Sequence, residues 1–382
     1  MIMAEYSREE QLFAGLALIR SRGLGPRTWR KILSRYGSPA RALDRCDQWK
    51  DEGLVRVDQL RSFKSGSWKK DVEQELEVII RKKMRVVIWS DPEYPQALTR
   101  ISDPPVMLYC RGDISLLNNP CLAVVGSRQS SAYGLEMARD ICAELASCGV
   151  TIVSGFAYGI DRQAHLAAVD RTGGTIAVLG TGIDLVYPGG NKDLWIRLAE
   201  KGLILTEFSP GTRPDPGNFP YRNRIISGLS LGVLVVQSAM KSGSMITARL
   251  ALDQNREVFA VPGAVTMENY GGCNHLIKEG AHLVQSAEDI LQVLAPIVRI
   301  SSPATPKQAD QEPARSLPED LDPGARKVVR HLQSNPGVHI DELSEKLGCS
   351  SQEISRSLVS LEIRGLVRRA PGMYYSLKDQ TG

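Results

Sequence analysis

Residues that suit a phosphate chain follow several short apolar runs of this sequence. The loop after the first run reads Gly126-Ser127-Arg128 and leads into an expected helix. Backbone N–H groups at a helix N-terminus and an arginine side chain are both good partners for phosphate oxygens. A surface ion pair is the alternative role for Arg128. We therefore predict a phosphate contact at this loop, with Arg128 as its cation.

The same loop argues against a dinucleotide cofactor. The fingerprint for NAD or FAD is G-x-G-x-x-G, whose second glycine lets the backbone approach a pyrophosphate. Here Arg128 occupies that position. The seven cysteines are scattered and never occur as C-x-x-C, so they indicate neither a zinc site nor a disulfide framework. We expect no cofactor and no metal.

A second glycine-rich loop holds Ser154 and Gly155, which we also predict to bind phosphate, and leads into a helix with Asp161 and His165. Asp161 and His165 are four residues apart on one helical face, a spacing compatible with acid–base chemistry. No nucleophile or metal-ligand set accompanies them. Structural roles are therefore favoured, with Asp161 as a helix cap and His165 hydrogen-bonded at the sheet edge. The sequence predicts no catalytic residue and no enzyme activity.

Cations and aromatic rings recur in the later loops. One segment places Arg222, Asn223 and Arg224 beside Phe219 and Tyr221. Arginines on phosphates next to rings that stack on bases are what a single nucleic-acid strand requires, although either ring could be core and Phe219 is the better core candidate. Further phosphate-binding candidates are Lys192, Arg213, Lys241, Ser242, Gly243 and Ser244. Several such loops at one sheet edge suit a polyphosphate chain better than one small phosphate.

Six short, almost continuously apolar runs must position these loops. They span residues 121–126, 150–155, 174–180, 203–208, 233–238 and 257–263. Runs without polar alternation are typical of strands buried on both faces of a parallel sheet, and segments of helical period lie between them. The pattern predicts an α/β fold with a Rossmann-like, doubly wound, mainly parallel sheet. In such folds ligands bind at the carboxyl ends of the strands.

Smaller domains are expected on both sides of this sheet domain, which we place at residues 76–298. Residues 1–75 read as helices around a Gly-Leu-Gly-Pro turn, which resembles helix-hairpin-helix and sterile-alpha-motif-like modules; a helical packing domain is the alternative. Residues 299–320 are rich in proline and read as a disordered linker. Residues 321–382 show three helical segments and a strand pair. That order is the outline of a winged helix.

Composition excludes some classes of protein. The chain begins without a basic stretch followed by an apolar run, and nowhere do about 18 uncharged apolar residues follow one another. We therefore expect no membrane association and a cytoplasmic location. The net charge of +4 permits a nucleic-acid partner without requiring one.

Taken together, the motifs resemble the DNA-processing protein A family (DprA, also called Smf). They are G-S-R at 126–128, SGFAYGID..AH at 154–165, TIAVLGTGID..YP..N at 175–191, FPYRNRIISGL at 219–229, KSGSMITARLAL at 241–252 and VFAVPG at 258–263. The resemblance implies single-stranded DNA binding, protection of incoming strands and loading of the RecA recombinase during natural transformation. It also implies a homodimer formed through the Rossmann-like domain.

The resemblance further implies which side chains contact DNA, namely Arg128, Arg222, Arg224 and Lys241. The sequence departs from the family pattern at two places, because some relatives have lysines where this chain has Gly189 and Pro216. Lys192 and Arg213 lie close enough along the chain to replace them.

Two other functional classes remain open. Phosphoribohydrolases of the lysine-decarboxylase-like group use a related fold and are marked by P-G-G-x-G-T-x-x-E; after Thr247 this chain has Leu250 where that general-base glutamate would stand. A winged-helix transcription regulator with a ligand-sensing Rossmann domain is the third class. The winged helix could contact duplex DNA through Arg368 and Arg369, or it could dock a protein.

Overall fold

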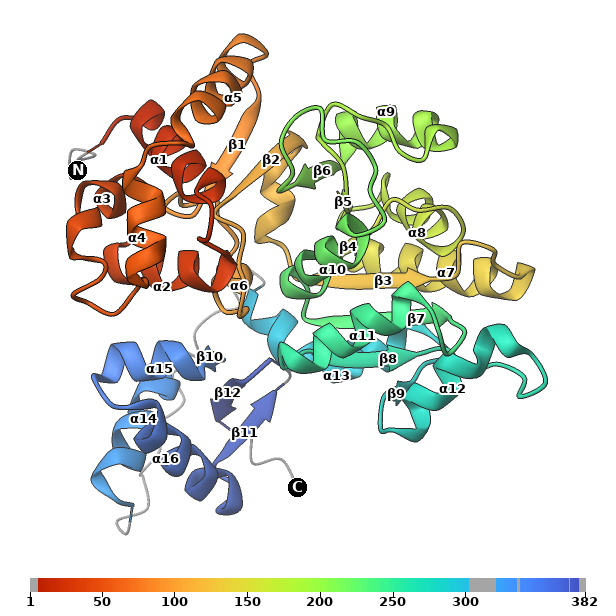
Figure 1. Ribbon diagram of the computed structural model, residues 1–382. Helices are drawn as coiled ribbons and strands as arrows, with labels where there is room; N and C mark the ends of the chain where they lie inside the picture. The colour runs from red at the N-terminus through yellow and green to blue at the C-terminus, as the bar shows by residue number, and fades with distance from the viewer. Residues whose placement is uncertain (1–5, 302–320, 335–336, 371, 378–382) are drawn as a thin grey trace. The chain divides into compact units, whose positions relative to one another are not determined.

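The computed structural model describes residues 6–301, 321–334, 337–370 and 372–377. The chain divides into two compact units, Met1–Gln254 with Val258–Ala287, and Asn255–Glu257 with Glu288–Gly382. The first unit contains two hydrophobic cores, and the second unit has a core of its own. Figure 1 follows the chain from one end to the other by colour.

A nine-stranded sheet forms the centre of the first unit, in the order β1-β2-β6-β5-β4-β3-β7-β8-β9. Its strands are β1 (Arg85–Ile88), β2 (Met107–Gly112), β3 (Cys121–Gly126), β4 (Thr151–Ser154), β5 (Thr175–Val178), β6 (Leu203–Thr206), β7 (Gly232–Gln237), β8 (Glu257–Ala260) and β9 (His282–Leu283). The pairs from β3 to β6 are parallel, as are β3–β7 and β8–β9. Among the pairs of this sheet whose register is given, only those of β2 with β1 and with β6 are antiparallel. The predicted Rossmann-like, mainly parallel sheet is confirmed.

The order in which the chain adds strands to the sheet reverses at β3. After β3 the chain adds β4, β5 and β6 on one side, and it then returns to place β7 on the other side. Ligands of doubly wound sheets bind outside the carboxyl ends of the strands at such a point. The loops that follow β3, β4 and β7 are therefore the ones that the fold brings together.

The six predicted apolar runs correspond to β3 through β8. Adjacent residues of these strands belong to different cores: Ala177 and Ile204 pack in one, and Val178 and Leu205 in the other. Both faces of the sheet are therefore buried, which explains why the runs lack polar alternation. The sequence pattern did not reveal β1 and β2, which extend one edge of the sheet, or the short β9 at the other edge.

Helices cover both faces of the sheet. They are α6 (Gln96–Thr99), α7 (Ala132–Ser147), α8 (Ile160–Ala168), α9 (Lys192–Lys201), α10 (Asn218–Leu229), α11 (Gly243–Asp253) and α12 (Gly271–Lys278). All of α13 (Ala287–Ser301) except its first residue belongs to the second unit. Leu194 and Leu198 of α9 join one core, whereas Ile225 of α10 and Ala248 of α11 join the other. The predicted linker lies outside the described residues from 302 to 320.

The N-terminal helices gather beside β1 and β2 (Figure 1). They are α1 (Arg8–Arg20), α2 (Pro26–Tyr36), α3 (Pro39–Asp44), α4 (Val57–Lys64) and α5 (Lys69–Arg81). Their buried side chains, such as Leu16 and Phe63, share a core with Ile88 of β1 and Tyr109 of β2. The helical module is thus packed as a continuation of the sheet domain.

The second unit contains the predicted winged helix. Its elements are α14 (Pro323–Ser334), β10 (Val338–His339), α15 (Ile340–Leu347), α16 (Ser351–Ile363), β11 (Val367–Ala370) and β12 (Tyr374–Leu377), with β12 between the other two strands. Val328, Leu343 and Leu358 hold the three helices together in one core. Across the described part of the chain, no helix is long and apolar enough to cross a membrane.

Candidate nucleic-acid interface

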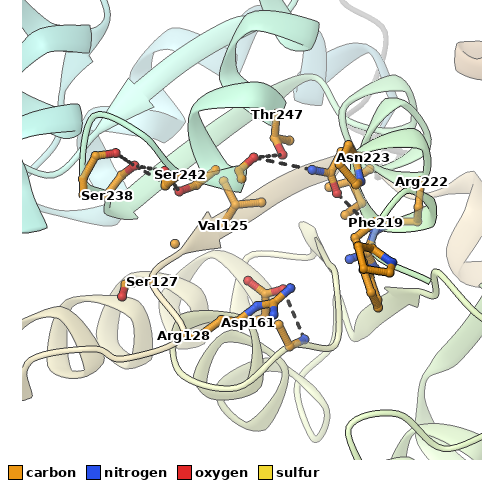
Figure 2. A pocket seen from close by; sticks show the side chains of 18 of the residues that line it. Val125, Ser127, Arg128, Asp161, Phe219, Arg222, Asn223, Ser238, Ser242 and Thr247 are labelled. Atoms are coloured by element: carbon orange, nitrogen blue, oxygen red, sulfur yellow. Dashed lines mark hydrogen bonds between the residues drawn. The ribbon is translucent and has the colours of Figure 1, made fainter. Parts of the chain in front are cut away.

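A cavity of about 530 Å³ lies at the carboxyl ends of β3 and β7 (Figure 2). Eight of the predicted phosphate-binding residues line it, namely Gly126, Ser127, Arg128, Arg222, Asn223, Ser242, Gly243 and Ser244. Figure 2 shows Ser238, Ser242 and Thr247 on one side of Val125, and Arg128 and Asp161 on the other. The fold therefore brings together loops that are more than a hundred residues apart in the sequence.

A smaller cavity of about 90 Å³ adjoins the first one and shares Arg128, Tyr187, Phe219 and Arg222 with it. The loop after β4 provides most of its other lining residues, including the predicted Gly155, and Pro188 comes from the segment after β5. The two cavities together follow the carboxyl ends of β3, β4 and β7. This is the arrangement expected for a ligand longer than a single phosphate.

Arg128 is an exposed cation at the mouth of both cavities. It forms no ion pair with any residue that the structure describes. Its guanidinium carbon lies 5.7 Å from the centre of the Phe219 ring. The ring centre of Phe219 lies in turn 5.7 Å from that of Tyr187, and the ring planes differ by 30°. One wall of the cavity is thus a cation followed by two stacked rings.

The sequence led to a wrong expectation for Phe219 and to none for Tyr187. The expectation that Phe219 belongs to the core is wrong, because this ring is only partly buried and lines both cavities. Sequence reasoning missed Tyr187, which is 42% exposed and follows β5. Its position in the motif with Pro188, directly after a strand-end loop, was the available signal.

Arg222 is a buried cation beneath this wall, with 5% of its surface exposed. Its Nη1 group donates to the carbonyl oxygens of Gly155, at 2.7 Å, and of Val178. Its Nε group donates to Oδ1 of Asn223 at 3.2 Å. Burial lowers the pKa of Arg222 to about 10; the nearby Asp161 carboxylate acts in the opposite direction, and Arg128 adds to the lowering. Arg222 thus ties the ends of β4 and β5 together at the cavity.

Asp161 holds the loop after β4. Its carboxylate accepts hydrogen bonds from the backbone N–H groups of Gly155, at 3.1 Å, and Ala157, at 3.3 Å. Burial raises the pKa of Asp161, and the charge of Arg222 opposes that rise. The predicted cap is wrong in its position, since the N-cap of α8 is Gly159 and Asp161 lies inside the helix. Asp161 nevertheless satisfies loop amides, which is a structural role.

His165 also has a structural role. Its Nδ1 atom lies 2.7 Å from Oγ1 of Thr175, and that hydroxyl donates its single hydrogen to the carbonyl of Ile152. Nδ1 must therefore carry the proton that joins the two side chains. Burial lowers the pKa of His165 to about 3, and Arg222 contributes in the same direction. His165 is a neutral side chain hydrogen-bonded to the sheet, as the sequence suggested.

Arg224 does not reach either cavity. It is 2% exposed and forms ion pairs with Glu207 and, at 3.5 Å, with Asp103. Its guanidinium carbon also lies 4.3 Å from the centre of the Tyr221 ring. These contacts give Arg224 a role inside the protein. Contact of Arg224 with DNA stays a prediction.

Hydroxyl groups form the wall opposite Arg128. The Oγ atoms of Ser238, Ser242 and Ser244 lie 2.7 to 3.0 Å from one another. Ser242 also caps α11 by accepting from the backbone N–H of Met245. Hydroxyl hydrogens can rotate toward an incoming acceptor, and the N-terminus of α11 favours an anion. Ser238 was missed because it was counted as the last residue of an apolar run.

The remaining predicted residues lie outside the cavities. Ser154 is buried and donates to the carbonyl of Val124 at 2.6 Å. Three cations, Lys192, Arg213 and Lys241, are exposed. Lys192 opens α9, and Lys241 directly precedes the serine that caps α11. DNA contacts of these three cations stay predictions.

The described residues form no cluster of metal ligands. They contain no group of three His, Cys, Asp or Glu side chains that could hold an ion. Each of the seven cysteines is a free thiol.

Solved structures of similar proteins share this architecture. The X-ray structure of DNA processing protein A from Streptococcus pneumoniae is 37% identical, with a TM-score of 0.65, and the match covers 74% of this chain and 97% of that one. DNA processing protein A from Helicobacter pylori, described for its single-stranded DNA binding mode, is 32% identical with a TM-score of 0.51. That match covers 56% of this chain and 96% of the other.

Sequence comparisons agree with the structural ones. Protein Smf of a Synechocystis strain is 37% identical over 328 residues, which are 79% of this chain and 82% of the relative. Residues 9–62 match a DprA-like N-terminal HHH domain, and residues 311–373 match the DprA winged helix domain. Residues 85–295 match the family described as DNA recombination-mediator protein A. These matches, together with the motifs at the ends of β3, β4, β5 and β7, show that the chain belongs to the DNA recombination-mediator protein A (DprA/Smf) family.

Proposed function

We propose that this protein binds single-stranded DNA along the cavities at the carboxyl ends of β3, β4 and β7. The observation that carries the proposal is the wall of Arg128, Phe219 and Tyr187, which joins an exposed, unpaired cation to two stacked rings. A cation that neutralises a phosphate beside rings that stack on bases is the combination that single-strand binding requires. The relative from Helicobacter pylori, described as binding single-stranded DNA, supports the proposal.

Binding at this site is independent of base sequence. The groups that face the cavity are a guanidinium, hydroxyls and the N-terminus of α11, all of which suit phosphate oxygens. Every base has a face that can stack on Tyr187, so the rings do not select one base.

The bound strand is protected and passed to the RecA recombinase during natural transformation. The description of the family as a recombination mediator supports this role. The test measures RecA filament assembly on a single strand with the protein present, with its Arg128→Ala variant, and without it. Assembly that the protein accelerates and the variant does not supports the role; equal assembly in all three contradicts it.

The role requires no catalysis, and it places the protein in the cytoplasm with the recombinase. The two groups that could have performed acid–base chemistry, Asp161 and His165, are buried in structural contacts.

We assign the loops after β7 and β8 to a homodimer, because they expose Met240, Val265 and Met267. Light scattering of the Val265→Asp/Met267→Asp variant tests this assignment, and an unchanged dimer mass would contradict it.

The winged helix suits a protein partner better than duplex DNA. Its third helix, α16, exposes Val359 to 54% and Ile363 to 82%. Helices that read duplex DNA present cations and polar groups to the major groove. The exposed Arg368 and Arg369 of β11 are the alternative duplex contacts. Two results together would favour that alternative. The Arg368→Ala/Arg369→Ala variant would lose duplex binding, and the Val359→Ser/Ile363→Ser variant would bind every partner as the native protein does.

Fluorescence anisotropy tests the proposed function directly. The protein is titrated into labelled single-stranded and duplex oligonucleotides of equal length over a range of salt concentrations. We expect tighter binding to the single strand, weakened by salt as phosphate contacts require. Equal or tighter binding to the duplex would favour a regulator, and no binding to either would favour a nucleotide enzyme.

A further inference from the structure

We infer that Asn191 is a positioning residue of the single-strand site, and that it fixes the place of the Tyr187 ring. It does so by joining the segment of residues 187–191, after β5, to the loop of residues 155–158, after β4. These two segments provide most of the lining of the smaller cavity. The inference rests on the proposed function and deepens it, because it names a residue that acts on bound bases without touching the strand.

The side chain of Asn191 is directed at the loop after β4. It is fully buried and lies outside the lining of both cavities. Its Nδ2 group donates to the carbonyl oxygens of Phe156, at 2.9 Å, and of Ala157, at 3.4 Å. Its Oδ1 atom accepts from Nη1 of Arg162 at 3.1 Å. Carbonyls only accept and a guanidinium only donates, so these partners fix the orientation of the amide.

Asn191 does not serve the helix that it precedes. It is the N-cap of α9, a position where the side chain of asparagine ordinarily accepts from a backbone N–H of the first turn. Within the described part of the chain, its side chain makes no such hydrogen bond. Capping of α9 therefore does not explain this asparagine, whereas the two carbonyls of the loop after β4 do.

The loop after β4 requires this support. Phe156 has a φ of +61°, in the left-handed region that a residue with a side chain occupies only where its surroundings hold it. Its ring is buried against that of Trp195, with 5.8 Å between the ring centres. Asp161 binds N–H groups of this loop, and Asn191 binds two of its carbonyl groups. Together they hold the backbone in its left-handed conformation.

The same asparagine holds the segment that carries Tyr187. The backbone N–H of Asn191 donates to the carbonyl of Pro188, the residue after Tyr187, at 3.1 Å. A second link joins the two segments, because the backbone N–H of Gly190 donates to the hydroxyl of Tyr158 at 3.3 Å. The Tyr187 ring is thus connected to the loop after β4 through hydrogen bonds of Asn191 and its neighbour.

Loss of this link should affect base stacking and leave phosphate contacts unchanged. The rings of Tyr187 and Phe219 provide the stacking surface, and Arg128 provides the phosphate contact. Stacking on rings adds affinity, whereas the salt slope reports the number of phosphate contacts. A Tyr187 ring that is free to move should therefore bind the strand less tightly with the same salt slope.

The first test is the full-length Asn191→Ala variant, which removes the amide without changing the charge. Asn119→Ala is the matched control, because Nδ2 of Asn119 donates to Oγ1 of Thr151 at the start of β4, away from the cavities. Binding is measured over a salt series with a single strand that contains 2-aminopurine, whose fluorescence falls when the base stacks. For Asn191→Ala we expect about tenfold weaker binding, or roughly 1.4 kcal/mol, with the native salt slope and less quenching. The control should bind as the native protein does.

A double variant tests whether Asn191 acts through Tyr187. In the Tyr187→Leu background, Asn191→Ala should cost little further affinity, because the ring that it positions is already absent. A general loss of stability would weaken binding in both backgrounds.

The Arg162→Ala/Asp193→Ala variant keeps the test valid if Asn191→Ala does not fold. It removes a partly exposed pair of opposite charges, so the net charge is unchanged, and it takes away the partner of Oδ1 of Asn191. We expect a smaller loss of affinity in the same direction, again with the native salt slope and less quenching. Native affinity in this variant would contradict the role of the amide.

Three further outcomes would overturn the inference. They are native affinity in folded Asn191→Ala, a lower salt slope in that variant, and an equal loss of affinity with and without the Tyr187 ring. Failure of the proposed function is distinguishable, because the native protein itself would then bind no single strand, and that result would overturn both proposals.

Discussion

Arg128 lies over the ring of Phe219, with 5.7 Å between the guanidinium carbon and the ring centre. A cation–π contact at an exposed site is worth about 0.5–1 kcal/mol, enough to favour one arrangement of a mobile side chain. It leaves the N–H groups of the guanidinium available to phosphate oxygens. Phe219 thus directs Arg128 toward the cavity before any ligand is bound.

Tyr187→Leu should weaken single-strand binding by about 1–3 kcal/mol, because it removes the exposed stacking surface at the cavity. The salt slope should stay that of the native protein, since no phosphate contact is lost. Anisotropy titrations over a salt series measure both quantities. Tyr133→Leu is the control, because Tyr133 is similarly exposed at 44% but lies outside the cavity. Equal affinities of the two variants would contradict a stacking role.

Gly189→Lys should strengthen single-strand binding. Pro188 next to it lines the smaller cavity, and a Cβ atom at Gly189 would meet no atom within 4 Å. One added phosphate contact should raise the salt slope by roughly 0.7. The same titrations test the gain, with Gly189→Ala as the neutral control. A lysine variant that binds like the alanine variant would show that Lys192 or Arg213 already fills this role.

Arg224→Met should destabilise the protein by about 3–5 kcal/mol, because it leaves the buried Glu207 carboxylate without its partner. Urea unfolding at neutral pH measures this loss. The double variant Arg224→Met/Glu207→Leu should recover much of it, since no unpaired charge then remains. A variant that keeps its stability but loses single-strand binding would instead make Arg224 a DNA contact.

His165 should make the protein sensitive to mild acid. Its pKa is about 3 in the folded protein against an ordinary 6.5, so the unfolded chain takes up a proton more readily. The contribution is complete above pH 6.5 and decreases as the pH falls from 6.5 toward 3. At pH 5 the loss should be about 2 kcal/mol, at 1.36 kcal/mol for each pH unit. His165→Asn keeps a donor for Thr175 without the titration, and urea unfolding at pH 7.5 and 5 should show a smaller decrease for this variant. An equal decrease in both proteins would contradict the assignment.

The sequence predicted the sheet well because its strands are buried on both faces. Ile176 and Ala177 are adjacent yet lie in different cores, so no polar residue interrupts the run and the strand is recognisable. The edge strand β1 is four residues long and follows a basic segment, which gave no such signal. β9 has only two residues.

The site was predicted less completely, because a motif shows which loop a residue belongs to but not where its side chain points. Arg222 and Arg224 are two residues apart on α10, and both were predicted to bind phosphates. Arg222 lines the cavities, whereas Arg224 points away to Glu207. Residues two apart on a helix face in different directions, and the partner that decides each direction comes from another strand end.

The most direct test of the account is the salt dependence of single-strand binding by Arg128→Ala, compared with the native protein. Arg139→Ala, which also removes one exposed arginine, is the control. We predict weaker binding and a salt slope lower by roughly 0.7 for Arg128→Ala, with no change in the control. A folded Arg128→Ala protein that keeps the native slope would contradict the assignment of this cavity to the DNA strand.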